Sequence, residues 1–298
     1  MTVSNLHPSI ATVLKRLGSG CQSLCRDERQ GRLWWADPVR ESAISRSDAG
    51  PRLFRVPLHD AVYAVCGTET GRLLLGLSKR LCIVAVPPHS GRRTESMRPL
   101  AIVDAVDPRV VISNGRADRS GMYVFGTRNV APDGRPIGSF FQFSERHGLR
   151  RLAIPTVVSA SSICFSRDGT HMMFADRFAQ KLYRCRYDAD AASIADIAIF
   201  VQAPDAVVLA DALVDADDCI WSAQQHAAGG VIVQYDHAGK VRQRFATGAI
   251  QPTGIAIGGA GQDRLMLLGD SGSLHMVNDL VVHGTAEARF DDAAGGMP

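Results

Sequence analysis

The sequence lacks any apolar run long enough to cross a bilayer as a helix, which takes about 20 consecutive residues. It also lacks the basic-then-apolar pattern of a secretory signal at its N-terminus. The net charge is +3, but the basic residues are dispersed and form no stripe with interleaved aromatics. These absences predict a cytoplasmic protein that binds neither membrane nor nucleic acid.

A disulfide framework is also missing. The seven cysteines are an odd number and are scattered along the chain rather than spaced as pairs. Most of them lie among apolar neighbours, where a free cysteine behaves as a small hydrophobic side chain. We therefore expect reduced, buried core residues at Cys66, Cys82, Cys164, Cys185 and Cys219.

A recurring phrase is the strongest positive signal: an apolar run, an Asp/Gly turn, then a second apolar run that is rich in aromatic residues. It is clearest over residues 24–37 and 162–176. Repeats of roughly 20–50 residues are typical of stacked or radially arranged units, none of which can bury its own apolar face alone. Six copies are indicated by turns near Gly31, Gly71, Gly121, Gly169, Asp218 and Asp263.

Each repeat also has room for a second pair of strands, which is visible at residues 181–187 and 231–245. Four short antiparallel strands in each of six repeats predict an all-β fold, the six-bladed β-propeller. We expect a single domain over residues 1–298, with about 290–298 as a disordered tail. Either residues 8–17 or residues 280–290 supply the outer strand that closes the ring, and the sequence leaves both open.

The central channel is the expected ligand site. In a propeller the innermost strand of each blade lines the channel, and loops crowd around one of its mouths. The residues predicted there are polar while the strands behind them are apolar, as in a pocket for a small molecule. The starts of the innermost strands are Cys21, Tyr63, Ser113 with Asn114, Ser161, Asp211 and Thr253. The loops after the second strands add Asp37, Arg128, Asp176 with Arg177, Gln224 with His226, and Asp270.

Five phrases, in the right order, resemble the gluconolactonase, regucalcin and luciferin-regenerating-enzyme family. The resemblance extends from about residue 15 to residue 275. The phrases are Gly-Arg-Leu-Trp-Trp-Ala-Asp at 31–37, Asn-Gly-Arg-Ala-Asp-Arg-Ser-Gly at 114–121, Phe-Ser-Arg-Asp-Gly at 165–169 with Phe-Ala-Asp at 174–176, Asp-Ala-Leu-Val-Asp-Ala-Asp at 211–217 with Ile-Trp at 220–221, and Pro-Thr-Gly-Ile-Ala at 252–256.

The resemblance implies a six-bladed propeller that holds one divalent cation in its channel and hydrolyses sugar lactones or related esters. Such a cation can polarise a lactone carbonyl while a carboxylate takes a proton from the attacking water. The family holds the cation through a Glu, an Asn and an Asp, and uses an Arg, an Asn and an Asp of blade three for further contacts. Carried over, the first set falls on Cys21, Ser161 and Asp211, and the second on Val111, Ser113 and Asn114.

Only Asp211 keeps the family's side chain, so we expect a degenerate metal site. One carboxylate with hydroxyls is a poor donor set for calcium, and a site with the Cys21 thiol would suit a softer ion such as zinc or iron. The likeness implies a divergent lactone or ester hydrolase, with Asp211 as a weak metal ligand or as a catalytic base. Two alternatives stay open: an inactive protein that binds a small polar ligand, and a different, metal-free reaction.

Overall fold

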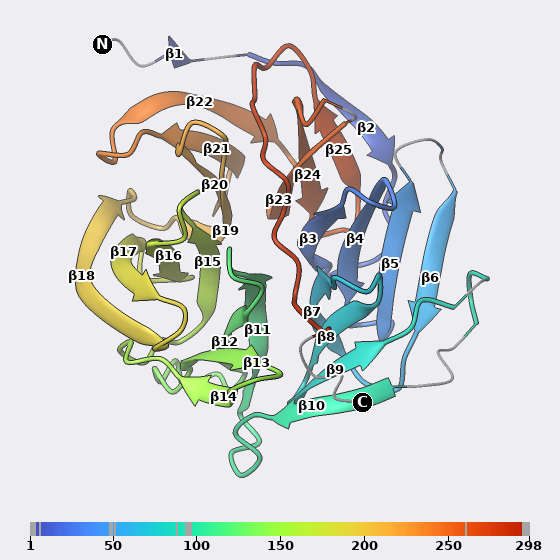
Figure 1. Ribbon diagram of the computed structural model, residues 1–298. Helices are drawn as coiled ribbons and strands as arrows, with labels where there is room; N and C mark the ends of the chain where they lie inside the picture. Colours follow the sequence, from blue (N-terminus) through green and yellow to red (C-terminus); the bar gives the residue numbers. More distant parts are fainter. Residues whose placement is uncertain are drawn as a thin grey trace.

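The computed structural model describes residues 4–5, 7–47, 50, 52–87, 89–92, 97–259 and 261–293. The described residues form 25 strands in six sheets, which stand around a central axis like the blades of a propeller (Figure 1). All neighbouring strands are antiparallel except the short β1 (Ser4–Asn5), which pairs with β22 (Val241–Gly248) in parallel. The predicted six-bladed β-propeller is confirmed. No helix in the described part of the chain is long and apolar enough to span a membrane.

The blades follow one another in sequence order, and within each blade the strands run outward from the channel. Blade 1 contains β3 (Gln22–Asp27), β4 (Arg32–Asp37), β5 (Ser42–Ser47) and β6 (Leu53–Pro57). Blade 2 contains β7 (Val62–Gly67), β8 (Leu73–Leu77), β9 (Arg80–Val84) and β10 (Met97–Ile102). Blade 3 contains β11 (Val110–Ala117), β12 (Tyr123–Asn129), β13 (Phe140–Ser144) and β14 (Gly148–Arg151).

The other three blades repeat this plan, and the N-terminus adds strands to two of them. Blade 4 contains β15 (Ala160–Phe165), β16 (His171–Asp176), β17 (Lys181–Asp188) and β18 (Ser193–Gln202). Blade 5 contains β19 (Val208–Val214), β20 (Ile220–His226), β21 (Gly229–Tyr235) and β22 (Val241–Gly248), with β1 (Ser4–Asn5) beside β22. Blade 6 contains β23 (Pro252–Gly258), β24 (Arg264–Gly269) and β25 (Leu274–Val277), with β2 (Ile10–Leu14) as its outer strand.

The core is divided into six apolar clusters, each of which lies between two neighbouring blades. Successive side chains of a strand point to opposite faces of its sheet. Trp34 therefore packs between blades 1 and 2, while Trp35 packs between blades 6 and 1. Inner strands such as β8 are buried on both faces and read as continuous apolar runs. No blade is complete alone, which is why the repeated phrase predicted a ring.

The recurring Asp/Gly turns are hairpins between the first and second strands of the blades. Asp27, Asp118 and Asp215 each accept two hydrogen bonds from backbone N–H groups of their own turn. A carboxylate that caps its own turn in this way is a common use of Asp in loops. All seven cysteines are free, and the five that were predicted to be buried are buried.

The ring is closed by the N-terminal segment. Strand β2 pairs antiparallel with β25, with Ile10 opposite Val277 and Ala11 opposite Met276. Of the two segments that the sequence left open, residues 8–17 therefore supply the closing strand. Blue β2 lies beside red β25 in Figure 1.

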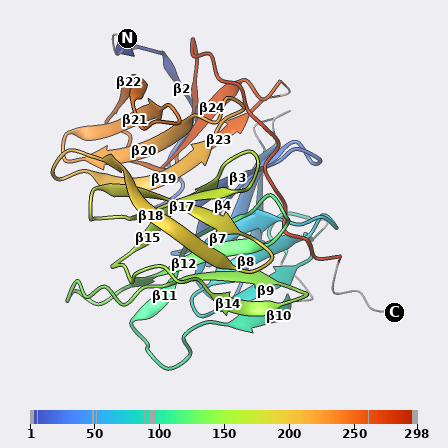
Figure 2. The same cartoon turned by 60° about the vertical axis from the view of Figure 1, so that its left-hand side comes forward.

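Residues 280–293 have a different position, and we call them the C-terminal strap. The strap crosses the axis of the propeller from blade 6 towards blades 2 and 3 (Figures 1 and 2). Gly284 donates to Gln262 of blade 6, and Ala216 of blade 5 donates to His283. These contacts involve the turns between first and second strands, so the strap closes the channel at the end opposite the predicted mouth.

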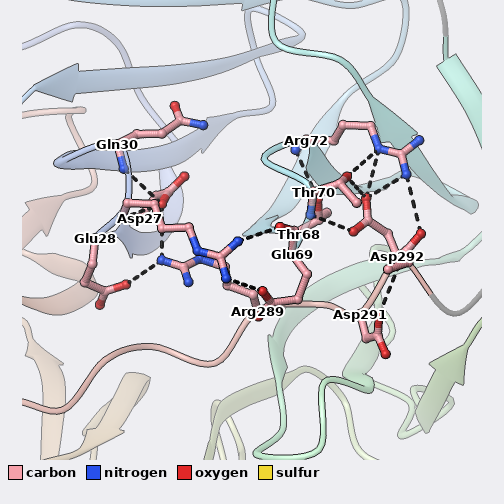
Figure 3. A network of polar contacts seen from close by, with 12 residues as sticks. Asp27, Glu28, Gln30, Thr68, Glu69, Thr70, Arg72, Arg289, Asp291 and Asp292 are labelled. Carbon is pink, nitrogen blue, oxygen red and sulfur yellow. Dashed lines mark hydrogen bonds and ion pairs between the residues drawn. The ribbon is translucent and has the colours of Figure 1, made fainter.

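The end of the strap is held by two polar clusters (Figure 3). Arg289 lies 3.4 Å from Asp27 and 3.2 Å from Glu28, measured between Nη2 and the nearest carboxylate oxygen. Asp292 accepts hydrogen bonds from Thr70 and from Arg72. Between these clusters Phe290 is completely buried. The prediction of a tail from residue 290 is therefore wrong for residues 290–293, while residues 294–298 lie outside the described residues.

Candidate functional site

A cavity of about 740 Å³ opens at the end of the channel where the innermost strands begin. We call it the mouth cavity. Its size is that of a small-molecule site. All six blades contribute to it, and six of the predicted residues line it: Cys21, Tyr63, Arg128, Arg177, Thr253 and Asp270. The other polar residues of the lining are Gln22, Asn129, Ser159, Gln225 and Gln251.

A β-bulge near the start of each innermost strand shapes the channel below the mouth. The register shifts at this point in every blade, and Ser23 and Ser162 take positive φ values of 61° and 58°. A bulge adds one unpaired residue and turns its side chain to a new direction. The six bulges are formed by residues 22–25, 62–64, 112–114, 161–164, 209–211 and 252–254.

Gln224 and His226 lie on the wrong face of β20 to reach the mouth cavity. They line a separate cleft beside β21 and β22, where Gln224 donates to the Tyr235 hydroxyl at 2.9 Å. Gln225, between them, points to the opposite face and lines the mouth. Because the side chains of a strand alternate, a one-residue error in the prediction exchanges the two faces. Their predicted place at the mouth is therefore wrong.

Asp176 stabilises the backbone of a loop that lines the mouth cavity. Its carboxylate accepts hydrogen bonds from the N–H groups of Val158 (2.9 Å) and Ser159 (3.1 Å). Ser159 lines the mouth cavity and so does Arg177, whereas Asp176 does not. Asp176, which was predicted to contact a ligand, therefore holds the loop at residues 158–159 in place instead.

Most of the polar side chains at the bulges are used between blades. Each is hydrogen-bonded to a backbone group of another blade, so the bonds together form a girdle around the channel. The donors and acceptors are Gln22 Nε2 to Tyr63 O (2.6 Å) and Ser113 O (2.7 Å), Ser113 Oγ to Ala160 O (2.8 Å), Ser161 Oγ to Leu209 O (2.9 Å), Ile255 N to Asp211 Oδ2 (3.0 Å) and Thr253 Oγ1 to Cys21 O (2.6 Å). The girdle joins the blades below the mouth cavity.

Cys21 contributes its carbonyl oxygen to the girdle, but its side chain packs into the core. The side chain is fully buried in the cluster between blades 6 and 1, near Leu24 and Trp35. Burial, and then the negative charge of Asp37, raise the pKa of the Cys21 thiol to about 12. A thiol binds metals and attacks substrates as the thiolate. Cys21 is therefore protonated at neutral pH.

Below the girdle lies a buried cluster of charges. Arg116 stands between two carboxylates, with Nη2 at 3.8 Å from Asp211 Oδ1 and Nη1 at 3.6 Å from Glu287 Oε2. Asp211 is 2% exposed, and it shares a small cavity of about 10 Å³ with Asn114, Arg116 and Glu287. Burial raises the pKa of Asp211, and the charge of Arg116 opposes this rise. Asp211 and Asn114 thus lie together, but not in the mouth cavity.

Glu287 belongs to the C-terminal strap, and sequence reasoning missed it. Burial raises its pKa to about 7, against the opposing charge of Arg116. Its backbone N–H donates to Glu28 Oε1 at 2.9 Å, which holds the strap under blade 1. No repeat or motif includes residue 287, so the sequence carried no signal for its position.

The raised pKa of Glu287 predicts a pH dependence of stability. Between pH 4.5 and about 7 the native state holds a proton on Glu287 that the unfolded state, with an ordinary pKa of 4.5, has already released. The stabilisation from this group is fully present below pH 4.5. As the pH rises through about 7, the free energy of unfolding falls by about 3 kcal/mol in all. Glu287→Gln should therefore match the wild type at pH 5 and be more stable at pH 8, in urea unfolding. Glu69→Gln, on an exposed carboxylate, is the control, and equal pH profiles for all three proteins would contradict the prediction.

The resemblance placed the family's cation ligands at Cys21, Ser161 and Asp211. Among the residues described, no three or more His, Cys, Asp or Glu side chains gather into a set that could hold a metal ion. Asp211 Oδ1 is buried without a hydrogen-bond partner, and the cation nearest to it is the guanidinium of Arg116. The hydroxyls of Ser113 and Ser161 donate to carbonyl groups of the girdle.

The fold and the site define a class, the six-bladed propellers with a small-molecule cavity at one end of the channel. The sequence model described as the SMP-30/Gluconolactonase/LRE-like region matches residues 21–268, and the chain belongs to this family, as its phrases predicted. L-arabinolactonase of Azospirillum brasilense is 29% identical over 271 residues, which cover 87% of this chain and 85% of that protein.

Two solved structures share the whole architecture. A luciferin-regenerating enzyme superposes with a TM-score of 0.83 at 17% identity, over 96% of this chain and 100% of that one. Regucalcin of Agrobacterium tumefaciens, a calcium-binding protein, has a TM-score of 0.83 at 20% identity, over 95% of this chain and 97% of its own. At these identities the likeness establishes the fold.

Proposed function

We propose that the protein hydrolyses a lactone or related ester of a small polar molecule in the mouth cavity, without a divalent cation. Membership of the family and the similarity to an L-arabinolactonase support the reaction class. The observation that carries the proposal is a wide, polar cavity with unpaired groups in its wall. Arg128 Nε and Gln251 Oε1 are buried there without a hydrogen-bond partner among the described residues. Buried polar groups are normally paired, so these two are available to a ligand.

We infer hydrolysis without a cation from the side chains that could coordinate a metal ion in the channel. Calcium and magnesium need several carboxylate, carbonyl or amide oxygens. Around Asp211 the nearest charged group is Arg116, which already balances the carboxylate. The Cys21 side chain lies in the core, and its thiol is protonated at neutral pH. The residues present do not fit the family's cation, and we infer that Arg116 supplies the positive charge in this part of the channel.

Hydrolysis then needs a proton acceptor that reaches the substrate. Asp270 is the one carboxylate among the described residues that line the mouth cavity, whereas Asp211 lies in the sealed layer below. We assign to Asp270 the role of general base, which takes a proton from the water that attacks the lactone carbonyl. Asp211 has a positioning role through Arg116. As the ring C–O bond breaks, the proton passes to the leaving oxygen, and the product is a hydroxy acid.

The test is lactone hydrolysis by protein that has been treated with a chelator and checked for residual metal. Activity on a panel that includes L-arabinono-1,4-lactone should stay within about twofold after metal removal. Asp270→Asn should lower kcat by about 100-fold, as for loss of a general base. Asp263→Asn, an exposed carboxylate on the same blade, is the matched control. Hydrolysis that needs an added cation would overturn the cation-free mechanism, and an Asp270 variant equal to the control would remove the assigned base.

A second candidate, binding without turnover, is favoured by the girdle. The hydroxyls of Ser113, Ser161 and Thr253 are committed to backbone carbonyls, which leaves few groups for catalysis. A rise in unfolding temperature with a sugar acid, unchanged by chelator and without turnover of any lactone in the panel, would establish this function in place of hydrolysis.

A further inference from the structure

Two arginines point into the same side of the mouth cavity. Arg128, at the end of β12 in blade 3, stacks on the ring of Tyr63 with its guanidinium carbon 4.9 Å from the ring centroid. Arg177 directly follows β16 in blade 4, and its Nη2 donates to Gln225 Oε1 at 2.9 Å. Gln225 in turn donates to the carbonyl of Pro252 at 2.9 Å. Both guanidinium groups are thus held in place by neighbouring blades.

These two positive charges have no counter-ion in the cavity wall beside them. Among the described residues, neither Arg128 nor Arg177 forms an ion pair with a carboxylate. Burial, and then the charge of Arg128, lower the pKa of Arg177 to about 10. The negative charge that opposes this is Asp211, in the layer below the mouth.

Asp270, the carboxylate of the mouth cavity, lies on the far side. Its negative charge helps to raise the pKa of Cys21 in blade 1. Blades 3 and 6 stand opposite each other in the ring of six (Figure 1). Arg128 lies at the end of the second strand of blade 3 and Asp270 follows the second strand of blade 6, so the two residues line the mouth cavity from opposite blades. The cavity therefore has a positive side on blades 3 and 4 and a negative side on blade 6.

Like charges that are half-buried together cost free energy unless something neutralises them. A planar guanidinium offers paired N–H donors that match the two oxygens of a carboxylate or a phosphate. Arg128 still has a free buried N–H at Nε. An anionic ligand group would satisfy this donor and both charges at once.

We propose that Arg128 and Arg177 bind an acidic group of the ligand, a carboxylate or a phosphate, so that the preferred substrate is an acidic sugar lactone. The substrate class rests on the proposed lactone hydrolysis, whereas recognition of the acid does not. Binding of the acid on blades 3 and 4 directs the other end of the ligand across the cavity to Asp270. The pair thus determines specificity and orientation, at a distance from the reacting carbonyl.

Binding is tested by calorimetry with three six-carbon ligands that the enzyme cannot hydrolyse: D-glucitol, D-gluconate and D-glucitol 6-phosphate. The better anion should bind at least about tenfold more tightly than D-glucitol, and its identity separates carboxylate from phosphate recognition. Arg128→Gln and Arg177→Gln should each remove about tenfold of this preference and leave D-glucitol unchanged. Arg186→Gln, which removes an exposed charge from an outer strand of blade 4, is the matched control.

Two further measurements separate the possible failures. The unfolding temperature of Arg177→Gln should equal or exceed that of the wild type, because a repelled charge is removed; a marked fall would assign a structural role instead. The value of kcat/KM should be higher for D-glucaro-1,4-lactone than for the neutral D-galactono-1,4-lactone. Equal affinity for all three ligands, or variants that equal the control, would overturn the anion site even if lactones are hydrolysed. Anion binding without any hydrolysis would retain the site and overturn the proposed reaction.

Discussion

A chain that ends at Asp279, and so lacks the C-terminal strap, should lose more than about 5 kcal/mol of its free energy of unfolding. The strap buries Phe290 completely and Val282 almost completely. Deleting a buried Phe side chain alone costs about 3–5 kcal/mol. A domain of ordinary stability has only about 5–15 kcal/mol in total, so the shortened protein should be largely unfolded at 37 °C.

Urea unfolding followed by circular dichroism measures this loss. Phe290→Ala isolates the apolar part and should cost about 3–5 kcal/mol while the protein still folds. A chain that ends at Ala293 keeps every contact of the strap described above, and it is the matched control. If the chain that ends at Asp279 were as stable as this control, the strap would be an appendage and not part of the core.

Replacing Arg116 by Met should lower the free energy of unfolding at pH 7 by about 3–5 kcal/mol. The guanidinium is the positive charge between Asp211 and Glu287, and its removal leaves two buried carboxylates without a partner. The loss should shrink as the pH falls, because protonation neutralises both acids. The double variant with Glu287→Gln should recover part of the stability at pH 7.

Arg119→Met is the control for this prediction. Arg119 follows the same strand, and its side chain donates to the carbonyls of Ser166 and Ala286 rather than to a carboxylate. Its loss removes hydrogen bonds to neutral groups, each of which contributes about 1 kcal/mol. Equal destabilisation by the two substitutions would show that Arg116 acts through packing and not through charge.

The architecture was predictable because it follows from local patterns that repeat. The apolar runs with turns at Gly31, Gly71 and Gly169 indicate hairpins, and hairpins that cannot bury their own faces indicate a ring. The family phrases lie in these hairpins, so they were recognisable for the same reason. Closure by residues 10–14 was one of two options, because residues 8–17 and residues 280–290 both had a suitable apolar pattern.

The mouth was predictable to within one residue, and that residue is decisive. The end of β20 was correctly placed beside the channel, but Gln225 and not Gln224 faces it. The bulges at the starts of the inner strands add a residue that no periodic pattern shows, and they separate Asp211 from the mouth. Local sequence gives the position of a strand more reliably than the face on which a given side chain lies.

The amino-acid sequence by itself determined the six-bladed ring and the buried cysteines, because both depend on residue types and on contacts near in sequence. Tertiary structure alone decided that the strap closes the channel, that Glu287 meets Arg116, and that Arg128 and Arg177 share one side of the mouth. Those contacts join segments from different blades or from the far end of the chain, and only closure of the ring brings such segments together.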